Sequence, residues 1–133
     1  MLRIVVPSAL IAFACLPAAC GGSSSGSGST VEMTSAQRFN PAAITVMAGT
    51  TVTWSNDDAQ THTVTAYEDG VPDGGYFASG DISDEAAARD DLQASLLAEG
   101  DTYEVTFDEP GTYRYFCIPH EQQGMKGEIV VEP

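Results

Sequence analysis

Nine residues near the C-terminus bring together three side chains that can bind a soft metal ion. Cys117 offers a thiolate, His120 an imidazole and Met125 a thioether, and the chain has only one other histidine, His62. A thiolate, two imidazoles and a weak thioether form the ligand set that selects copper in a trigonal redox site. We therefore take His62, Cys117, His120 and Met125 as candidate ligands of one copper ion.

Each of these side chains also has an ordinary structural role. A lone cysteine is commonly a buried apolar residue, a methionine can fill a core, and a histidine can lie in a loop. The combination carries the prediction, because Cys-x2-His-x4-Met follows a Tyr-x-Tyr-x-Cys strand and His62 follows a strand that ends in Trp54-Ser55-Asn56. A cysteine–histidine hydrolase would use the same thiol, but it would leave Met125 unexplained and there is no evident oxyanion-hole motif.

Period-2 patterns from residue 31 onward predict the strands that would position these residues. The expected strands are 43–47, 50–54, 61–67, 103–107, 112–117 and 127–131. Short strands with regular turns predict an all-β fold, a two-sheet Greek-key β-sandwich over residues 31–133. The stretch 81–97 departs from this pattern. Ser83 followed by acids and alanines predicts one short surface helix there.

Composition narrows the classes of partner. The chain has 133 residues, enough for one domain, and a net charge of −14. Phosphates would be repelled, so nucleic acid is excluded as a partner. The acidic surface is compatible with a salt-adapted source, or with redox partners that dock through basic surfaces. Of the three cysteines only Cys117 lies in the expected domain, so no disulfide framework is predicted.

The N-terminal residues are interpreted as a targeting signal. Residues 1–20 have a basic start and an apolar run too short to span a bilayer comfortably, which predicts a signal peptide. Small residues before Cys20 are similar to a lipoprotein signal box, so lipidation of Cys20 is expected. Cleavage after Ala14 is the alternative. Residues 21–30 are almost entirely Gly and Ser and predict a flexible tether. We expect an extracytoplasmic protein, in the periplasm or at the cell surface, anchored to the membrane by lipid.

The motifs resemble those of a known family. The segment from Cys117 through His120 to Met125-Lys126-Gly127 resembles the copper loop of plastocyanins and the related halocyanins, and 111–117 resembles the strand before that loop. Residues 39–62 resemble the family's first half. The resemblance covers about 31–67 and 100–133, whereas 68–99 do not align convincingly.

That resemblance implies a cupredoxin fold and a type 1 copper site. His62, Cys117 and His120 would form a trigonal set, with Met125 as a long axial ligand. His120 would expose its ring edge through an apolar patch that includes Ile118, Pro119, Gly124 and Met125. Tyr113 is expected either in the core or at a tyrosine corner, with its hydroxyl satisfied by backbone. Phe116 stands where plant plastocyanins usually carry a tyrosine used in partner contact.

The function expected from this resemblance is that of a monomeric electron carrier between redox proteins such as a cytochrome or an oxidase, and not that of an enzyme. Copper enzymes of the superfamily need further histidines, and the chain has two. Two alternatives remain open at this point. The same ligands would serve a protein that delivers or stores copper, and zinc could occupy them.

Overall fold

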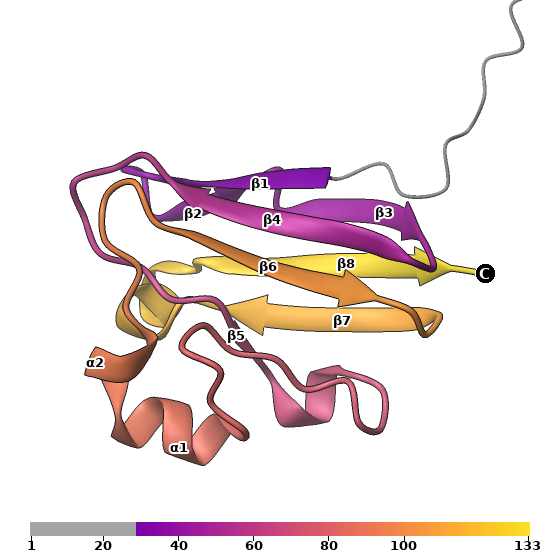
Figure 1. Cartoon of the computed structure of the whole chain (residues 1–133). Coiled ribbons are helices and arrows are strands. Elements are labelled where there is room, and N and C mark those ends of the chain that lie inside the picture. The colour runs from indigo at the N-terminus through magenta and orange to yellow at the C-terminus, as the bar shows by residue number, and fades with distance from the viewer. Residues whose placement is uncertain (1–28) are drawn as a thin grey trace, which may run out of the picture.

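Two four-stranded sheets pack face to face in the computed structural model, which describes residues 29–133 (Figure 1). One sheet has the order β2-β1-β4-β6 and the other the order β3-β8-β7-β5. The strands are β1 Ser29–Thr34, β2 Arg38–Asn40, β3 Ala43–Met47, β4 Thr50–Asn56, β5 Thr65–Ala66, β6 Thr102–Phe107, β7 Gly111–Phe116 and β8 Lys126–Glu132. The predicted all-β sandwich is confirmed.

Alternation along the strands explains why the sheets pack as they do. In β4 the side chains of Val52 and Trp54 are fully buried, and Thr53 between them is only partly covered. In β7 Tyr113 and Tyr115 face the core. Trp54 meets Tyr115 edge to face with ring centroids 5.3 Å apart, so the aromatic centre of the core joins the two sheets.

The strand pairing brings two ligand-bearing segments to one end of the sandwich. β1 pairs with β4 in parallel and β7 pairs with β8 antiparallel. The end of β4 and the connection from β7 to β8 therefore lie at the same end, opposite the start of β1 and the C-terminus (Figure 1). That connection contains a 3-10 segment, Ile118–Gln123.

Three local predictions need correction. Residues 61–67 do not form one strand: only Thr65–Ala66 pairs as β5, and His62 makes an isolated bridge to Leu97. The predicted helix in 81–97 is two short helices, α1 Glu85–Asp90 and α2 Leu92–Ser95.

The third correction concerns the helix cap. Asp84, not Ser83, caps α1, because its carboxylate accepts the Ala87 N–H at 2.8 Å. A second aspartate, Asp91, ends α1 and caps α2, which divides the helix.

The N-terminal predictions fall almost wholly outside the described residues. The signal peptide at 1–20, the lipidation of Cys20 and most of the tether at 21–30 lie there. Within the described part, β1 begins at Ser29, two residues before the expected start of the domain. No helix among residues 29–133 is long and apolar enough to cross a membrane.

The tyrosine corner is present. The Tyr113 hydroxyl donates to the Glu109 carbonyl at 2.8 Å, across the turn that leads into β7. By contrast, the buried Tyr76 hydroxyl has no hydrogen-bond partner among the described residues. The two tyrosines therefore form a matched pair for one test.

We predict that Tyr113→Phe lowers the free energy of unfolding by about 1 kcal/mol, the usual net value of one hydrogen bond. Tyr76→Phe should leave stability unchanged or raise it, because it removes a buried hydroxyl that has no partner. Urea unfolding of the metal-free protein measures both. Equal losses in the two variants would show that the corner bond contributes nothing.

Candidate metal centre

Three of the four predicted ligands converge on one point. The Cys117 Sγ lies 3.4 Å from His120 Nδ1 and 3.9 Å from His62 Nδ1, and the two Nδ1 atoms are 3.2 Å apart. Nitrogen and sulfur ligands bind a first-row ion at about 2.0–2.3 Å, which separates donors around a common centre by about 3.4–3.8 Å. The observed triangle fits a single ion.

His62 is held by groups on both sides. Its backbone N–H donates to the Leu97 carbonyl at 3.1 Å, and the Leu97 N–H donates back at 2.8 Å. On the ring, Nε2 lies 3.4 Å from the Asp58 carboxylate. A proton on Nε2 that faces this carboxylate leaves the Nδ1 lone pair free for a metal, which is how outer carboxylates orient ligand histidines.

Cys117 directly follows β7 and is fully buried. The Thr63 N–H donates to its Sγ at 3.4 Å, and the Ile118 N–H donates to the Thr63 hydroxyl at 2.8 Å. Thr63 thus ties the residue after His62 to the residue after Cys117. Burial raises the pKa of the Cys117 thiol, and the hydrogen bonds from Thr63 and His120 offset part of that rise.

His120 lies on the 3-10 segment and is half-buried, between the interior and solvent. Burial lowers the pKa of His120, and the neighbouring His62 lowers it further. The ring is therefore neutral at pH 7, the form that binds a metal. Partial exposure of His120 agrees with the expected exposed ring edge.

Met125 closes the loop. Its carbonyl accepts the Cys117 N–H at 3.0 Å, and its N–H donates to the His120 carbonyl at 3.1 Å. Its side chain is fully buried, so Met125 does not belong to the exposed patch expected around His120. Pro119 and Gly124 are exposed and Ile118 is half-buried, as expected for that patch.

The sequence interpretation missed the residues that support the ligands. Asn56 is fully buried at the end of β4, and its amide donates to the carbonyls of Gln60 and Leu97 at 2.8 and 3.0 Å. Asn56 thereby fixes the loop that carries Asp58. The available signals were an acid four residues before His62 and a threonine directly after it.

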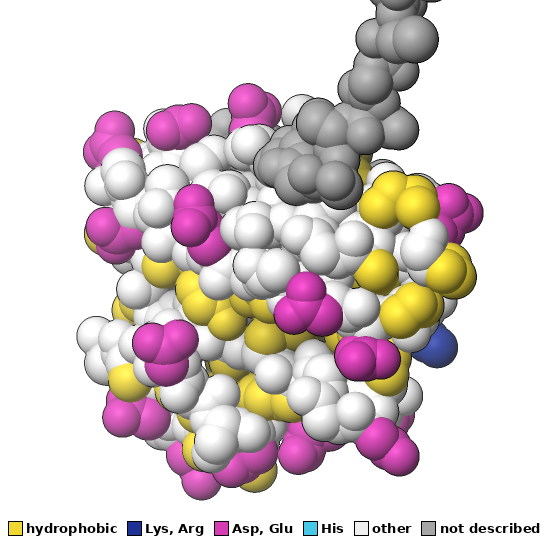
Figure 2. Space-filling view, turned by 45° about the vertical axis from the view of Figure 1, so that its right-hand side comes forward, with side chains coloured by type: hydrophobic (Ala, Val, Ile, Leu, Met, Phe, Trp, Pro, Cys, Tyr) yellow, Lys and Arg dark blue, Asp and Glu magenta, His cyan; other side chains and the backbone are white. Residues whose placement is uncertain are grey.

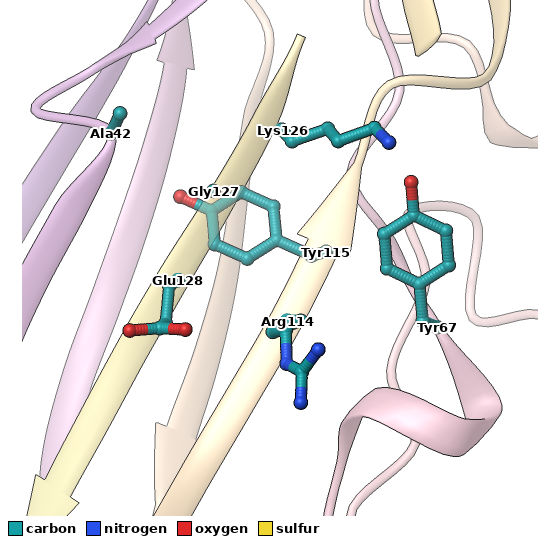
Figure 3. Close-up of a pocket in the computed structure, with 7 residues that line it drawn as sticks. All are labelled: Ala42, Tyr67, Arg114, Tyr115, Lys126, Gly127 and Glu128. Carbon is teal, nitrogen blue, oxygen red and sulfur yellow. The ribbon is translucent and has the colours of Figure 1, made fainter. Parts of the chain in front are cut away.

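Another hollow lies on the outer face of the second sheet and is separate from the metal centre. It has a volume of about 340 Å³ and is lined by β7, β8 and Tyr67 (Figure 3). None of its lining residues is one of the four candidate ligands.

A β-sandwich whose loops gather a buried cysteine thiol and two imidazoles defines a class of copper-binding protein. The family model of copper-binding proteins, the plastocyanin/azurin family, matches residues 27–132. The chain therefore belongs to the plastocyanin/azurin family, and its cofactor is copper.

Relatives and solved structures agree with this assignment. Plastocyanin of Scenedesmus fuscus is 42% identical over 71% of this chain and 86% of its own length. Amicyanin-alpha of Methylorubrum extorquens is 31% identical over 99% of this chain and its whole length. The copper-containing nitrite reductase of Thermus scotoductus aligns with a TM-score of 0.61 and 26% identity, over 80% of this chain and 22% of the enzyme chain.

We predict that the metal-free Cys117 thiol reacts slowly with a disulfide reagent at pH 7 and quickly in denaturant, because it is buried and protonated. Its folded pKa lies above the unfolded value of about 8.5. The unfolded chain therefore ionises first, and the stability of the metal-free protein should fall as pH rises above that value. Labelling of a Cys15→Ser/Cys20→Ser chain measures the first effect, and urea unfolding at pH 7 and 9.5 measures the second. Rapid labelling of the folded protein at pH 7 would contradict the burial of the thiol.

Proposed function

We propose that this protein carries single electrons between redox partners, with a type 1 copper held by His62, Cys117 and His120 and with Met125 as the axial ligand. One observation carries the proposal: the three donor atoms lie 3.2–3.9 Å apart, at separations that a single metal ion can bridge. Donors that the fold holds at these separations would need little rearrangement between the two oxidation states.

The chain's own residues would do three things at this site. Thr63 and the fully buried shell around Cys117 would hold the thiolate away from water, which tunes the reduction potential. Asp58 would keep the proton of His62 on Nε2. Half-buried His120 would present its ring to a partner, since His62 and Cys117 are fully buried. When bound, the copper supplies the one-electron couple itself.

An enzyme is disfavoured by the count of histidines. The chain has two, and both lie at the same centre. A second copper for substrate would have no histidine ligand. We therefore propose a carrier, although the fold also occurs within a copper-containing nitrite reductase.

Redox proteins are the proposed partners, and their basic surfaces are a further part of the proposal. Acidic side chains are spread over the face in Figure 2 and do not gather in one patch. Electrostatic steering by the net charge of −14 would disappear near 1 M salt, where the Debye length is about 3 Å. A rate with a basic cytochrome that does not change with salt would remove steering from the proposal.

We predict an intense blue absorption band for the Cu(II) protein, which ascorbate bleaches and reoxidation restores. Cys117→Ser should abolish the band, because the thiolate–copper bond produces it. Met125→Leu should keep the band and change the reduction potential, because the axial ligand tunes that potential. Visible spectra and voltammetry measure both effects.

The outcomes separate the candidate functions. A protein that loads copper but stays colourless contradicts the blue-copper proposal and favours copper delivery or zinc binding. A blue protein that gives its copper readily to a chelator but shows no reversible couple also favours delivery.

The proposed address is the outer side of a membrane, with Cys20 lipidated. The support is geometric: β1 begins at the end of the sandwich opposite the ligand loop (Figure 1), so a tether attached there would leave His120 free. We predict that Cys20→Ala moves the protein from the membrane fraction to the soluble fraction of its source cells, whereas Cys15→Ala does not. Wild-type protein recovered in the soluble fraction would contradict the anchor.

A further inference from the structure

Helix α1 reaches the ligand loop through one side chain, Arg89. Its guanidinium donates to both carboxylate oxygens of Glu121, at 2.8 and 3.3 Å. It also donates twice to one oxygen of Glu85, at 2.9 and 2.7 Å. The forked guanidinium therefore joins its own helix to the residue that directly follows His120, with the paired geometry that makes arginine–carboxylate contacts strong and directional.

The same guanidinium covers the residue before Cys117. Its central carbon lies 4.4 Å from the ring centroid of Phe116, which is fully buried. Tyr67 stacks on this ring with centroids 4.3 Å apart and planes inclined by 24°. The Tyr67 hydroxyl then donates to Glu121 at 2.9 Å. Arg89 and Tyr67 thus enclose Phe116 and meet again at Glu121.

Glu121 is the only charged residue between Cys117 and Gly124. Elsewhere in this loop, the Gly124 N–H donates to the Glu121 carbonyl at 2.9 Å and the Ile118 N–H donates to the Thr63 hydroxyl at 2.8 Å. On the side that faces α1, the Glu121 carboxylate is the group that ties the loop to the rest of the protein, and it receives its hydrogen bonds from Arg89 and Tyr67.

We propose that Arg89 is a positioning residue for the copper site, which acts through Glu121 to hold the 118–124 segment, and with it His120, in place. The inference rests on the proposed copper site, and it assigns a role to helix α1 in the 68–99 region. A loop held from outside keeps the site assembled without the metal and slows the departure of the metal.

An isolated surface ion pair would not hold the loop in place, because exposed ion pairs contribute little to stability. This pair differs in two ways. The guanidinium is bidentate to Glu121, and it stacks on a buried aromatic ring, so its position is fixed on two sides. The expected consequence is local: the 118–124 segment opens more often, while the unfolding of the whole domain changes little.

Arg114 supplies the matched control. It lies on β7 and lines the groove beside Tyr67 and Lys126 (Figure 3). It forms no ion pair within residues 29–133, where Arg89 forms two. Arg114 lines a second hollow together with Glu121 and Tyr67, but no hydrogen bond or ion pair among the described residues joins Arg114 to Glu121. Arg114→Gln therefore removes the same charge from the same side of the molecule and leaves the hydrogen bonds of Glu121 in place.

The experiment compares the full chain with Arg89→Gln, Glu121→Gln, the double variant and Arg114→Gln. The first readout is the rate at which the copper-loaded protein gives up copper to excess chelator. The second is amide hydrogen exchange of residues 118–124 in the metal-free protein. Arg89→Gln should release copper about tenfold faster, in the range for lost outer partners of metal ligands, and should increase exchange at 118–124. Arg114→Gln should change neither.

Non-additivity identifies the path. If Arg89 acts through Glu121, the double variant should behave like Glu121→Gln alone. Additive effects, wild-type release by Arg89→Gln, or an equal effect of Arg114→Gln would each overturn the proposal. Exchange that rises throughout the domain would also overturn it, because Arg89 would then only contribute to general stability. A failure of the copper proposal is seen earlier and separately, as a wild-type protein without the blue band.

Discussion

The buried thiol of Cys117 is the constraint on which the rest of the structure depends. A thiolate that must bind a metal cannot be surrounded only by apolar side chains, yet a wet site would cost the metal its fixed geometry. The fold resolves this by bringing groups from two separate chain segments to the sulfur. Thr63 offers an N–H to the sulfur from one side, and His120 approaches from the other. The sulfur remains fully buried and still accepts a hydrogen bond from the Thr63 N–H.

Each of the two sheets positions one of the segments that carry the ligands. Asn56 ends β4 of the first sheet and fixes the loop before His62, while β7 and β8 of the second sheet hold Cys117 and Met125 together through one backbone hydrogen bond. Because the aromatic core joins these sheets, the distance between His62 and Cys117 follows from packing and not from the flexibility of either loop. The most exposed of the three donors, His120, lies on the 3-10 segment between β7 and β8, and Arg89 of α1 is hydrogen-bonded to that segment from outside.

Residue types and spacing were enough to predict the sandwich and to select the side chains that converge. The thiol and both imidazoles could be selected from the sequence because few residue types bind soft metals, and this chain has few such residues. In the structure these three side chains meet as predicted. Local pattern failed where tertiary contacts decide. The run 61–67 has strand propensity, but His62 turns to pair with Leu97 and leaves only Thr65–Ala66 in the sheet. Serine and aspartate both cap helices well, so the sequence alone did not distinguish Ser83 from Asp84. In the structure it is the Asp84 carboxylate that accepts the Ala87 N–H.

The supporting residues could not be predicted, for the same reason. Asn56 and Asp58 are residue types that occur in any polar loop, and Arg89 is a residue type that is common on the exposed face of a helix. Their roles depend on distances between segments, such as the contact from Arg89 to Glu121 across 32 positions of sequence. From the sequence alone, the helical stretch that contains Arg89 could be a surface insertion without function or an outer support for the metal-binding loop. The fold distinguishes the two, because it places Arg89 against Glu121.

The most direct measurement is X-ray absorption at the copper edge, on the same sample in its oxidised and reduced forms. A preassembled carrier site predicts one sulfur and two nitrogen ligands at bonding distance in both forms, with distances that change little on reduction. Loss of a nitrogen ligand on reduction, or the absence of a sulfur ligand in either form, would contradict a rigid electron-transfer site built from His62, Cys117 and His120.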